Sequence, residues 1–231
     1  MKAIIVAIYD RPELTKIVLD YYREKSKKYG FEVIVVGSEG EKSRRLAKGF
    51  HYVEVPNSPL SYKNNYMVWK AKELNVDGVI LIGSDDLLSD NLLKFYMKQP
   101  NKRTFLGMPS AYFYSIDKDE LIRYHSSSQS IGAGRYFSRY VLEKVGWKLW
   151  QKPLDSKLDT DSLDYLSQCG IKESLFTVKD SMVLDIKYCS SSGCINITKF
   201  EVLKDLSEPA DINLIEKYFG KKLLDKIRRL K

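Results

Sequence analysis

Short apolar segments alternate with longer amphipathic ones along the first third of the chain. Residues 3–8 (AIIVAI), 31–36 and 78–82 are continuous runs of mostly branched aliphatic residues, typical of strands that are buried on both faces. Between the first two runs, apolar residues recur at steps of three and four from Leu14 to Tyr22, which predicts an amphipathic helix. The order strand, helix, strand predicts parallel strands joined by a right-handed crossover.

Local signals mark the ends of this helix and continue the alternation. Pro12 suits the first helical position, Glu13 complements the helix dipole, and Gly30 provides a C-terminal stop. A strand at 52–55 and a helix at about 61–74 follow. We therefore expect an α/β fold with a Rossmann-like, mostly parallel sheet flanked by helices.

The pattern changes after the run at 78–82. The segment AYFYSIDKDELIRYH (111–125) predicts a hairpin that turns at 117–120, and Ser89 is placed to cap a helix. Further helices are predicted at 89–98, 138–145, 159–167 and 211–231, and further strands at 104–108, 175–178 and 182–186. No repeat or clear linker divides the chain, so we expect one main domain over 1–205 with a basic helical C-terminal extension over 206–231.

Composition places the chain among ordinary globular proteins. Of its 231 residues, 44% are hydrophobic and 12% aromatic. No window reaches the roughly 18 apolar residues of a membrane span, and the first apolar run is followed at once by charged residues. Three cysteines, Cys169, Cys189 and Cys194, fit reduced thiols, so we expect a cytoplasmic protein. The formal net charge of +8 favours an anionic partner such as a nucleotide, a nucleic acid or a phospholipid surface.

Polar residues follow three of the predicted strands. In doubly wound sheets, ligands bind outside the carboxyl ends of the strands. By that rule, three groups of residues should lie at the same edge of the sheet. They are Tyr9, Asp10 and Arg11, then Gly37, Ser38 and Glu39, and then Asp85 and Asp86.

The two consecutive acids Asp85 and Asp86 come directly after a buried strand. Mg²⁺ and Mn²⁺ prefer hard oxygen ligands and are commonly held by one or two carboxylates together with substrate phosphates. Such a metal would neutralise a diphosphate leaving group. The alternative is that both acids cap the turn and the following helix. The surrounding alternation of strands and helices favours the metal.

Several segments together resemble glycosyltransferases of the GT-A fold, close to family 2. In the first half these segments are YDRPE, VGSEG, SYKNNYMVWKAKE and VILIGSDD, and the resemblance extends through 131–147 (IGAGRYFSRYVLEKVGW) and 158–166 (LDTDSLDYL). It covers about residues 3–200, and small bacteriophage or bacterial members are nearest. The DxD-type signature of the family sits where Ser84, Asp85 and Asp86 stand here, with Gly83 in the place of the first acid of a fuller signature.

The resemblance implies sugar transfer from a UDP- or GDP-type nucleoside-diphosphate sugar to an acceptor hydroxyl, with inversion and with Mn²⁺ or Mg²⁺. It makes Asp85 and Asp86 metal ligands. Many relatives add a later histidine or aspartate, and because His51 and His125 come too early, Asp185 in VLDIK is the substitute. The alternative for Asp185 is a solvated residue at a strand end.

The resemblance also implies a set of donor contacts. An aromatic face suits a base, a carboxylate suits donors on the base or the sugar, and a lysine suits a phosphate as a mobile point charge. The alternatives are helix capping for Asp10, core packing for Tyr9 and a solvated surface position for Lys63. The implied donor-binding residues are Tyr9, Asp10, Arg11, Ser38, Glu39, Lys63, Asn64, Ser84 and Asp85.

An inverting transfer needs a carboxylate that takes the proton from the acceptor hydroxyl. Asp159 and Asp161 are the candidates, and Asp159 is favoured because LDTDSL is most similar to the family segment there. Both could instead be first-turn carboxylates stabilised by the helix dipole. On the acceptor side, Gly132 and Gly134 would let the backbone approach a sugar or acceptor, with Arg135 available for phosphate. GAGRYF lacks the third glycine and the opening strand of a dinucleotide fingerprint, so we reject that interpretation.

The identity of the acceptor is the most open part of the prediction. Basic residues cluster at 23–28, 42–48 and 221–231. With the phage-like resemblance, which would place the protein in the host cytoplasm, they suggest a polyanionic acceptor such as a hydroxylated base of modified DNA. A glycan or a protein side chain is the alternative.

Two other functions compete with sugar transfer. A nucleotidyltransferase is disfavoured because YDRPELTK lacks the glycine-rich loop typical of that class. A non-catalytic nucleic-acid-binding protein would depend on its basic residues rather than on Asp85 and Asp86.

Overall fold

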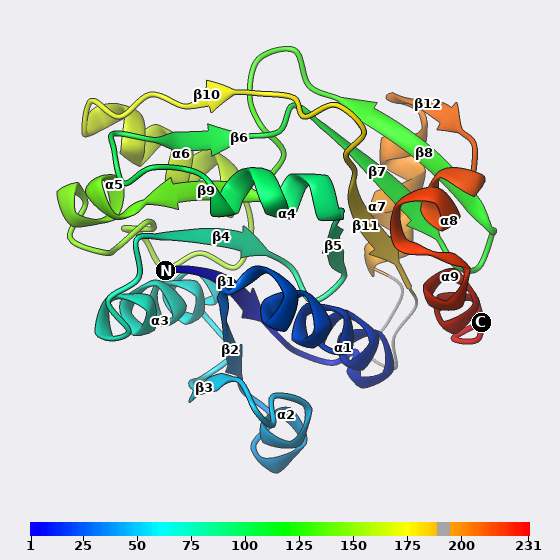
Figure 1. Cartoon of the computed structure of the whole chain (residues 1–231), viewed down its shortest axis with the longest axis horizontal. Helices are drawn as coiled ribbons and strands as arrows, with labels where there is room; N and C mark the ends of the chain where they lie inside the picture. Colours follow the sequence, from blue (N-terminus) through cyan, green and yellow to red (C-terminus); the bar gives the residue numbers. More distant parts are fainter. Residues whose placement is uncertain (189–194) are drawn as a thin grey trace.

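The computed structural model describes residues 1–188 and 195–231, which form two β-sheets (Figure 1). The strands of the larger sheet are β1 (Lys2–Ala7), β2 (Glu32–Gly37), β3 (His51–Glu54), β4 (Gly78–Ile82), β6 (Phe105–Gly107), β9 (Arg135–Ser138) and β10 (Ser174–Leu175). Those of the smaller sheet are β5 (Asp86–Leu88), β7 (Ser110–Ser115), β8 (Glu120–His125), β11 (Val183–Lys187) and β12 (Ser207–Ala210). Their orders are β10-β6-β9-β4-β1-β2-β3 and β12-β8-β7-β11-β5.

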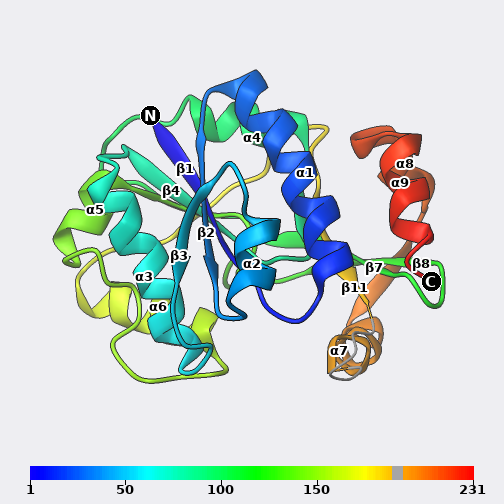
Figure 2. The same ribbon diagram turned by 90° about the horizontal axis from the view of Figure 1, so that it is seen from below.

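Helices cover both faces of the larger sheet. The helices are α1 (Pro12–Tyr29), α2 (Glu41–Leu46), α3 (Leu60–Glu73), α4 (Asp90–Met97), α5 (Arg139–Lys144), α6 (Leu158–Gln168), α7 (Ile195–Lys204), α8 (Asn213–Phe219) and α9 (Lys221–Arg228). Figure 2 shows α1 and α4 on one side of the sheet and α3, α5 and α6 on the other. The helices α7, α8 and α9 lie beside the smaller sheet.

Strand β1 shows why the apolar runs are continuous. Ile4 and Val6 belong to the core on the α1 side, and Ala3 and Ile5 to the core on the α3 side, all fully buried. Because side chains alternate between the two faces of a strand and both faces are covered, no position along the run is left for a polar residue.

The pairing confirms the predicted α/β fold with a mostly parallel sheet flanked by helices. Strand β1 pairs in parallel with β2 and β4, and β2 with β3, while β9 is antiparallel to β4 and β6. The first helix has Pro12 at its start and ends at Gly30 in the left-handed conformation, with φ 69°. The predicted hairpin is also present, as β7 and β8.

Three local predictions needed correction. Ser89 precedes α4 but makes no capping bond, because its hydroxyl accepts from the amide of Met182 and ties the helix to the segment before β11. The strand predicted at 175–178 is only the two residues of β10. The C-terminal helix is two helices, because Gly220 has φ 86° and interrupts it.

The sequence patterns missed α2, β5, β9, α7 and β12. These elements are short or lack a clear period, and three of them pair with or pack on segments that are distant in sequence.

The C-terminal residues pack on the smaller sheet. Strand β12 pairs with β8 at the sheet edge. On α9, Leu224 and Ile227 are buried in the core, and the guanidinium of Arg228 donates two hydrogen bonds to Asp119 in the β7–β8 turn.

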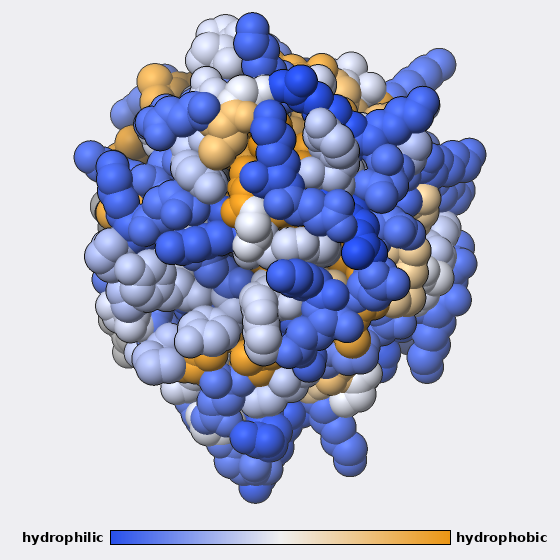
Figure 3. All heavy atoms as spheres, turned by 90° about the vertical axis from the view of Figure 1, so that its left-hand side faces the viewer, coloured by the Kyte–Doolittle hydropathy of each residue, from blue (hydrophilic) through white to orange (hydrophobic). Residues whose placement is uncertain are grey.

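The face that carries α3, α5 and α6 is mainly hydrophilic, and hydrophobic residues reach it only in small patches (Figure 3). Among the residues that the structure describes, none of the helices combines the length and the apolar character that a membrane crossing requires. Cys169 is a free, half-buried thiol, and Cys189 and Cys194 lie outside the described residues.

Candidate active site

The turn between β4 and β5 carries the chain from one sheet to the other and positions two carboxylates. A Cβ atom at Gly83 would lie 2.6 Å from Oδ1 of Asp85, so glycine leaves the space into which that carboxylate folds back. The amide of Gly83 donates to Oδ2 of Asp86. Asp86 is the first residue of β5, so it does not cap the following helix.

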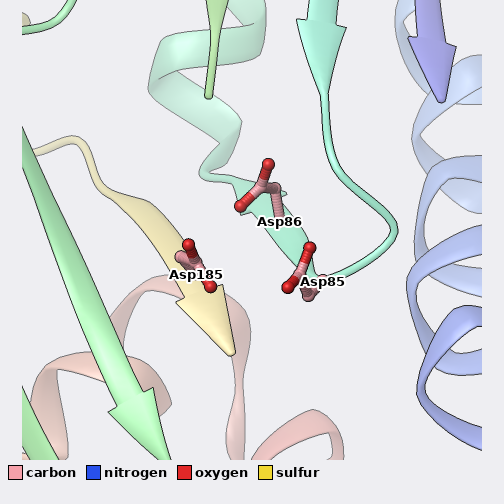
Figure 4. A group of neighbouring side chains, drawn as sticks. All are labelled: Asp85, Asp86 and Asp185. Carbon is pink, nitrogen blue, oxygen red and sulfur yellow. The ribbon is translucent and has the colours of Figure 1, made fainter. Parts of the chain in front are cut away.

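A third carboxylate reaches the same place from β11. Strand β11 is antiparallel to β5, with Asp185 directly opposite Asp86. One oxygen from each of Asp85, Asp86 and Asp185 lies within 4.8 Å of the others, and the three side chains point toward one another (Figure 4). The structure thus places Asp185 beside the signature acids rather than at a solvated strand end.

Two cations flank the three acids. The guanidinium of Arg11 pairs with Oδ2 of Asp85 and donates to the hydroxyl of Ser84 at 3.0 Å. The ammonium of Lys187 lies 2.8 Å from Oδ2 of Asp185. Arg11 comes from the start of α1, and Lys187 is the last residue of β11.

Burial and neighbouring charges shift the pKa values of the three clustered acids in different directions. Burial raises the pKa of Asp86 well above its ordinary value, and the negative charges of Asp185 and Asp85 raise it further. Burial likewise raises the pKa of Asp185 to about 6, although Lys187 opposes the rise. For Asp85, burial is outweighed by the charges of Arg11 and Lys187, and the pKa is lowered.

These acids fit a divalent cation. Oδ1 of Asp185 is buried and finds no hydrogen-bond partner within the described part of the chain. A buried carboxylate oxygen without a partner is costly unless a ligand satisfies it. Together with Asp85 and Asp86, this carboxylate forms a set of hard oxygen donors of the kind that Mg²⁺ or Mn²⁺ prefers.

The acids line a cleft of about 910 Å³ at the carboxyl ends of β1 and β4. Its lining also includes residues that follow β1, that open α3, that precede β9 and that begin α6. The predicted site residues on its wall are Tyr9, Asp10, Arg11, Lys63, Asn64, Ser84, Asp85, Asp86, Gly132, Asp159 and Asp185.

The residues after β1 face the cleft. Tyr9 is 47% exposed, so it is not a core residue. The cap position of α1 is Arg11, whose own side chain makes no capping hydrogen bond. Asp10 adopts a left-handed backbone conformation, with φ 53°, and its amide donates to Glu39. Tyr9 is therefore not packed in the core, and Asp10 is not the cap residue of α1.

Lys63 differs from the mobile surface charge that we expected. It is only 2% exposed, and its ammonium donates to the carbonyl of Ile8, the hydroxyl of Ser38 and Oδ1 of Asn57. Burial lowers its pKa to about 8, against an opposing effect of Glu39. The lysine is thus an internal brace between the ends of β1 and β2 and the segment after β3.

Asn64, the next residue, is 8% exposed, and its Oδ1 has no partner in the described chain. Because Asn64 lines the cleft, that oxygen is placed to accept a hydrogen bond from a ligand.

Ser38 and Glu39 are held by other protein groups. The hydroxyl of Ser38 donates to Asn57, and the carboxylate of Glu39 accepts from the amide of Asp10 and the ammonium of Lys42. Neither is among the residues that line the cleft. They support the cleft wall through Asp10 and Asn57.

Asp159 projects over the loop before β9. Its side chain is 59% exposed, and a Cβ atom at Gly132 would lie 2.2 Å from its Oδ1. The glycine at 132 therefore leaves room for this carboxylate. Asp161 on the same helix is not part of the cleft lining, and its buried Oδ2 finds no partner among the described groups.

Arg135 is not available for a phosphate, contrary to our expectation. It is fully buried, and its guanidinium donates to the hydroxyl and carbonyl of Ser130, to the carbonyl of Asp159 and to the hydroxyl of Ser162. Burial lowers its pKa, and the charges of Asp159 and Glu173 oppose this effect. Arg135 therefore fixes the start of α6, while Gly134, with φ 81°, donates its amide to Leu81.

The polar residues of the cleft that the sequence patterns overlooked include Asn57, Asp155 and Lys187. Asn57 follows β3, so the strand-end rule applied to that strand would have included it. Lys187 is two residues beyond Asp185 on one strand and so shares its face. For Asp155, whose carboxylate accepts from Ser58 and Leu60, we see no sequence signal.

Comparison with known proteins finds similarity only at the level of structure. No family model matches the chain, and no curated protein matches its sequence. A mannosyltransferase from Pyrobaculum calidifontis, solved in complex with GDP-Man and Mn²⁺, has a similar structure, with a TM-score of 0.52 at 15% identity over 99% of this chain and 69% of that one. A glycosyltransferase involved in the glycosylation of the major capsid of PBCV-1 has a TM-score of 0.48 at 10% identity, covering 88% and 98%. The first likeness shows that this chain shares the fold of that mannosyltransferase.

Proposed function

We propose that the protein is a metal-dependent glycosyltransferase that moves a sugar from a nucleoside-diphosphate sugar to an acceptor hydroxyl. The observation that carries this proposal is the convergence of Asp85, Asp86 and Asp185 in a cleft that also contains Asp159. Metal ligands and a carboxylate base within one cleft are what such a transfer needs.

The residues after β1 and the acids form the donor side of the cleft. Tyr9 offers an exposed ring for the base, and Asn64 offers an amide oxygen that finds no partner among the described residues. Asp85, Asp86 and Asp185 would hold Mn²⁺ or Mg²⁺, which stabilises the charge on the departing diphosphate as a Lewis acid. Arg11 holds Asp85 and Ser84 in place for this role.

Asp159 is the proposed catalytic base. Its carboxylate takes the proton of the acceptor hydroxyl while the hydroxyl oxygen forms a bond to the anomeric carbon of the sugar. The bond from that carbon to the diphosphate oxygen breaks on the opposite face, so the configuration inverts and the nucleoside diphosphate leaves with the bonding electrons. Asp159 suits this role because it is exposed in the cleft, whereas Asp161 is not part of the cleft wall.

For the donor, GDP-sugars deserve the first trial because the similar mannosyltransferase was solved with GDP-Man. UDP-sugars, the other donor type that the family resemblance implies, are tested beside them.

For the acceptor, we propose a polyanion, with a hydroxylated base of phage-modified DNA as the concrete candidate. The net charge of +8 supports it. Several cations at 23–28 and 42–48 pair with acids of the chain, among them Lys25 and Lys28 with Asp90. The basic face of α9, with Lys221, Lys222 and Lys226 exposed, therefore supports a polyanion best. A neutral glycan or a protein side chain remains the alternative acceptor.

Thermal unfolding with nucleotide sugars tests the proposed function. We expect one class among UDP-, GDP-, CMP- and dTDP-sugars to raise the melting temperature with Mn²⁺ and not with EDTA. A ligand at 100 times its Kd stabilises the folded state by about 2.7 kcal/mol. Asp85→Asn and Asp86→Asn should abolish this shift, because each removes a charged oxygen ligand.

Asp117→Asn is the matched control, since Asp117 is an exposed carboxylate in the β7–β8 turn. It should leave the shift intact. If no nucleotide sugar stabilises the wild-type protein, sugar transfer is excluded and a non-catalytic nucleic-acid-binding function becomes the better explanation.

A further inference from the structure

Lys187 is a buried lysine beside the proposed metal site. Its side chain is only 7% exposed, and its ammonium lies 2.8 Å from Oδ2 of Asp185 and 5.3 Å from the ring centre of Phe113. Residues two apart on a strand share a face, so Lys187 and Asp185 both point toward the cleft that they line. Burying an ammonium is costly unless a strong partner or a function compensates.

The ion pair occupies one oxygen of a carboxylate that the metal would bind. Oδ2 of Asp185 accepts from Lys187, while Oδ1 of the same carboxylate has no partner in the described chain. A divalent cation on Oδ1 would therefore share this carboxylate with the ammonium, and the two like charges would repel each other.

A divalent cation would make the charge of the cluster positive. Metal ligands must be deprotonated, so in the loaded site three ionised carboxylates would face Arg11, Lys187 and the metal. Three negative charges against four positive ones leave one net positive charge, which attracts a diphosphate.

We propose that Lys187 is a metal-gated donor-binding residue, which neutralises Asp185 before metal binds and moves to the donor diphosphate once the metal occupies that carboxylate. This inference rests on the proposed function. It implies ordered binding, with the metal first and the nucleoside diphosphate second.

The two flanking cations differ in a way that assigns the moving role to Lys187. Arg11 has a rigid, planar head that two partners hold, Asp85 and Ser84. Lys187 has a flexible stem, and its ammonium has one charge-assisted hydrogen bond among the described groups, to Asp185. A lysine can thus exchange one anionic partner for another by rotating its side chain.

Calorimetric titration of Lys187→Met tests the proposal with two ligands. Mn²⁺ alone should bind the variant about tenfold more tightly than the wild type, because a competing charge-assisted hydrogen bond is gone. GDP or UDP in saturating Mn²⁺ should bind about tenfold more weakly, because one phosphate contact is lost. Opposite changes in the two affinities are the signature of the exchange.

Two further variants separate this role from a structural one. Lys187→Arg should restore the affinity for the nucleoside diphosphate, whereas Lys204→Met, which breaks an exposed lysine pair with Glu120, should change neither affinity. Thermal unfolding of each variant checks that it is folded, and Lys187→Gln replaces any variant that is not.

If Lys187→Met weakens both affinities or changes neither while the wild type binds GDP or UDP with Mn²⁺, the inference is wrong and the proposed function stands. If the wild type binds no nucleoside diphosphate, both fail together.

Discussion

Asp159 depends on its neighbours for its place at the cleft. Gly132 leaves the space that its carboxylate occupies, and the buried guanidinium of Arg135 bonds to its carbonyl and lies 3.5 Å from its Oδ1. No other residue of α6 that we singled out reaches the cleft lining. At the scale of single residues, a neutral replacement at this position therefore tests the base directly.

Asp159→Asn should lower the transfer rate by about a hundredfold or more, because it removes the proton acceptor. Donor binding should be nearly unchanged, since the substitution leaves the three clustered acids intact. Single-turnover rates and donor-induced melting shifts measure the two effects separately. Asp161→Asn is the control, and full activity of Asp159→Asn together with loss in Asp161→Asn would reverse the assignment.

Lys63 links stability to pH. Its pKa is about 8 in the folded protein because of burial, and roughly 10.4 in an unfolded chain. Between these values the unfolded state binds more protons, so folding becomes more favourable as the pH rises, and below about 8 the cost of burying the charge is fully present.

The unfolding free energy of the wild type relative to Lys63→Met should therefore increase between pH 8 and pH 10, by up to about 1.4 kcal/mol per pH unit. Denaturant unfolding at several pH values measures it. Lys72→Met, on the exposed face of the same helix, is the matched control. A difference that stays flat over this range would show that Lys63 keeps its proton.

At the scale of elements, the loop before β9 and the start of α6 are fitted to each other. Gly132 has a backbone conformation that other residues can also adopt, but an added methyl group would collide with the carboxylate of Asp159. Gly146, after α5, shows the opposite case, with φ 64° and open space around it. These two glycines separate the effect of a contact from the effect of backbone strain.

Gly132→Ala should reduce transfer at least tenfold, because small displacements of a catalytic group are costly, while the melting temperature changes little. Gly146→Ala should lower stability by about 1 kcal/mol through its strained backbone and leave transfer unchanged. Rate measurements and thermal unfolding distinguish the two. Equal rates for Gly132→Ala and the wild type would mean that Asp159 does not act from this position.

The whole molecule is basic, with a formal net charge of +8, and net charge bears on association with partners rather than on the fold. If the acceptor is DNA, the transfer rate at subsaturating DNA should fall steeply between about 50 and 200 mM salt. Binding of the protein releases cations that are condensed on the DNA phosphates, and added salt opposes that release. Lys222→Gln and Lys226→Gln should each reduce the slope of log affinity for DNA against log salt concentration by about one.

A neutral glycan acceptor is the control, and its transfer rate should depend little on salt. A flat rate with hydroxylated DNA, with donor binding held constant, would exclude an electrostatically bound DNA acceptor.

Local patterns in the sequence were sufficient for much of the fold. The continuous apolar runs of β1, β2 and β4, together with the ends of α1, determine a parallel α/β core, because a fully buried strand has no polar positions. The strand-end rule then placed Tyr9, Asp10, Arg11 and the signature acids on one rim, where the structure has them. These predictions succeeded because they depend on neighbours within a few residues.

Tertiary structure alone decided which distant residues meet and which charges are buried. Asp185 stands opposite Asp86 only because β11 joins β5 in the second sheet, and no local pattern specifies that pairing. Lys63 and Arg135 look like surface cations in the sequence but are buried braces. The sequence by itself therefore determined which residues lie at the strand ends around this site. Burial depends on what packs over a side chain from elsewhere in the fold, so the packing of the two sheets determined which acids meet and which charges are buried.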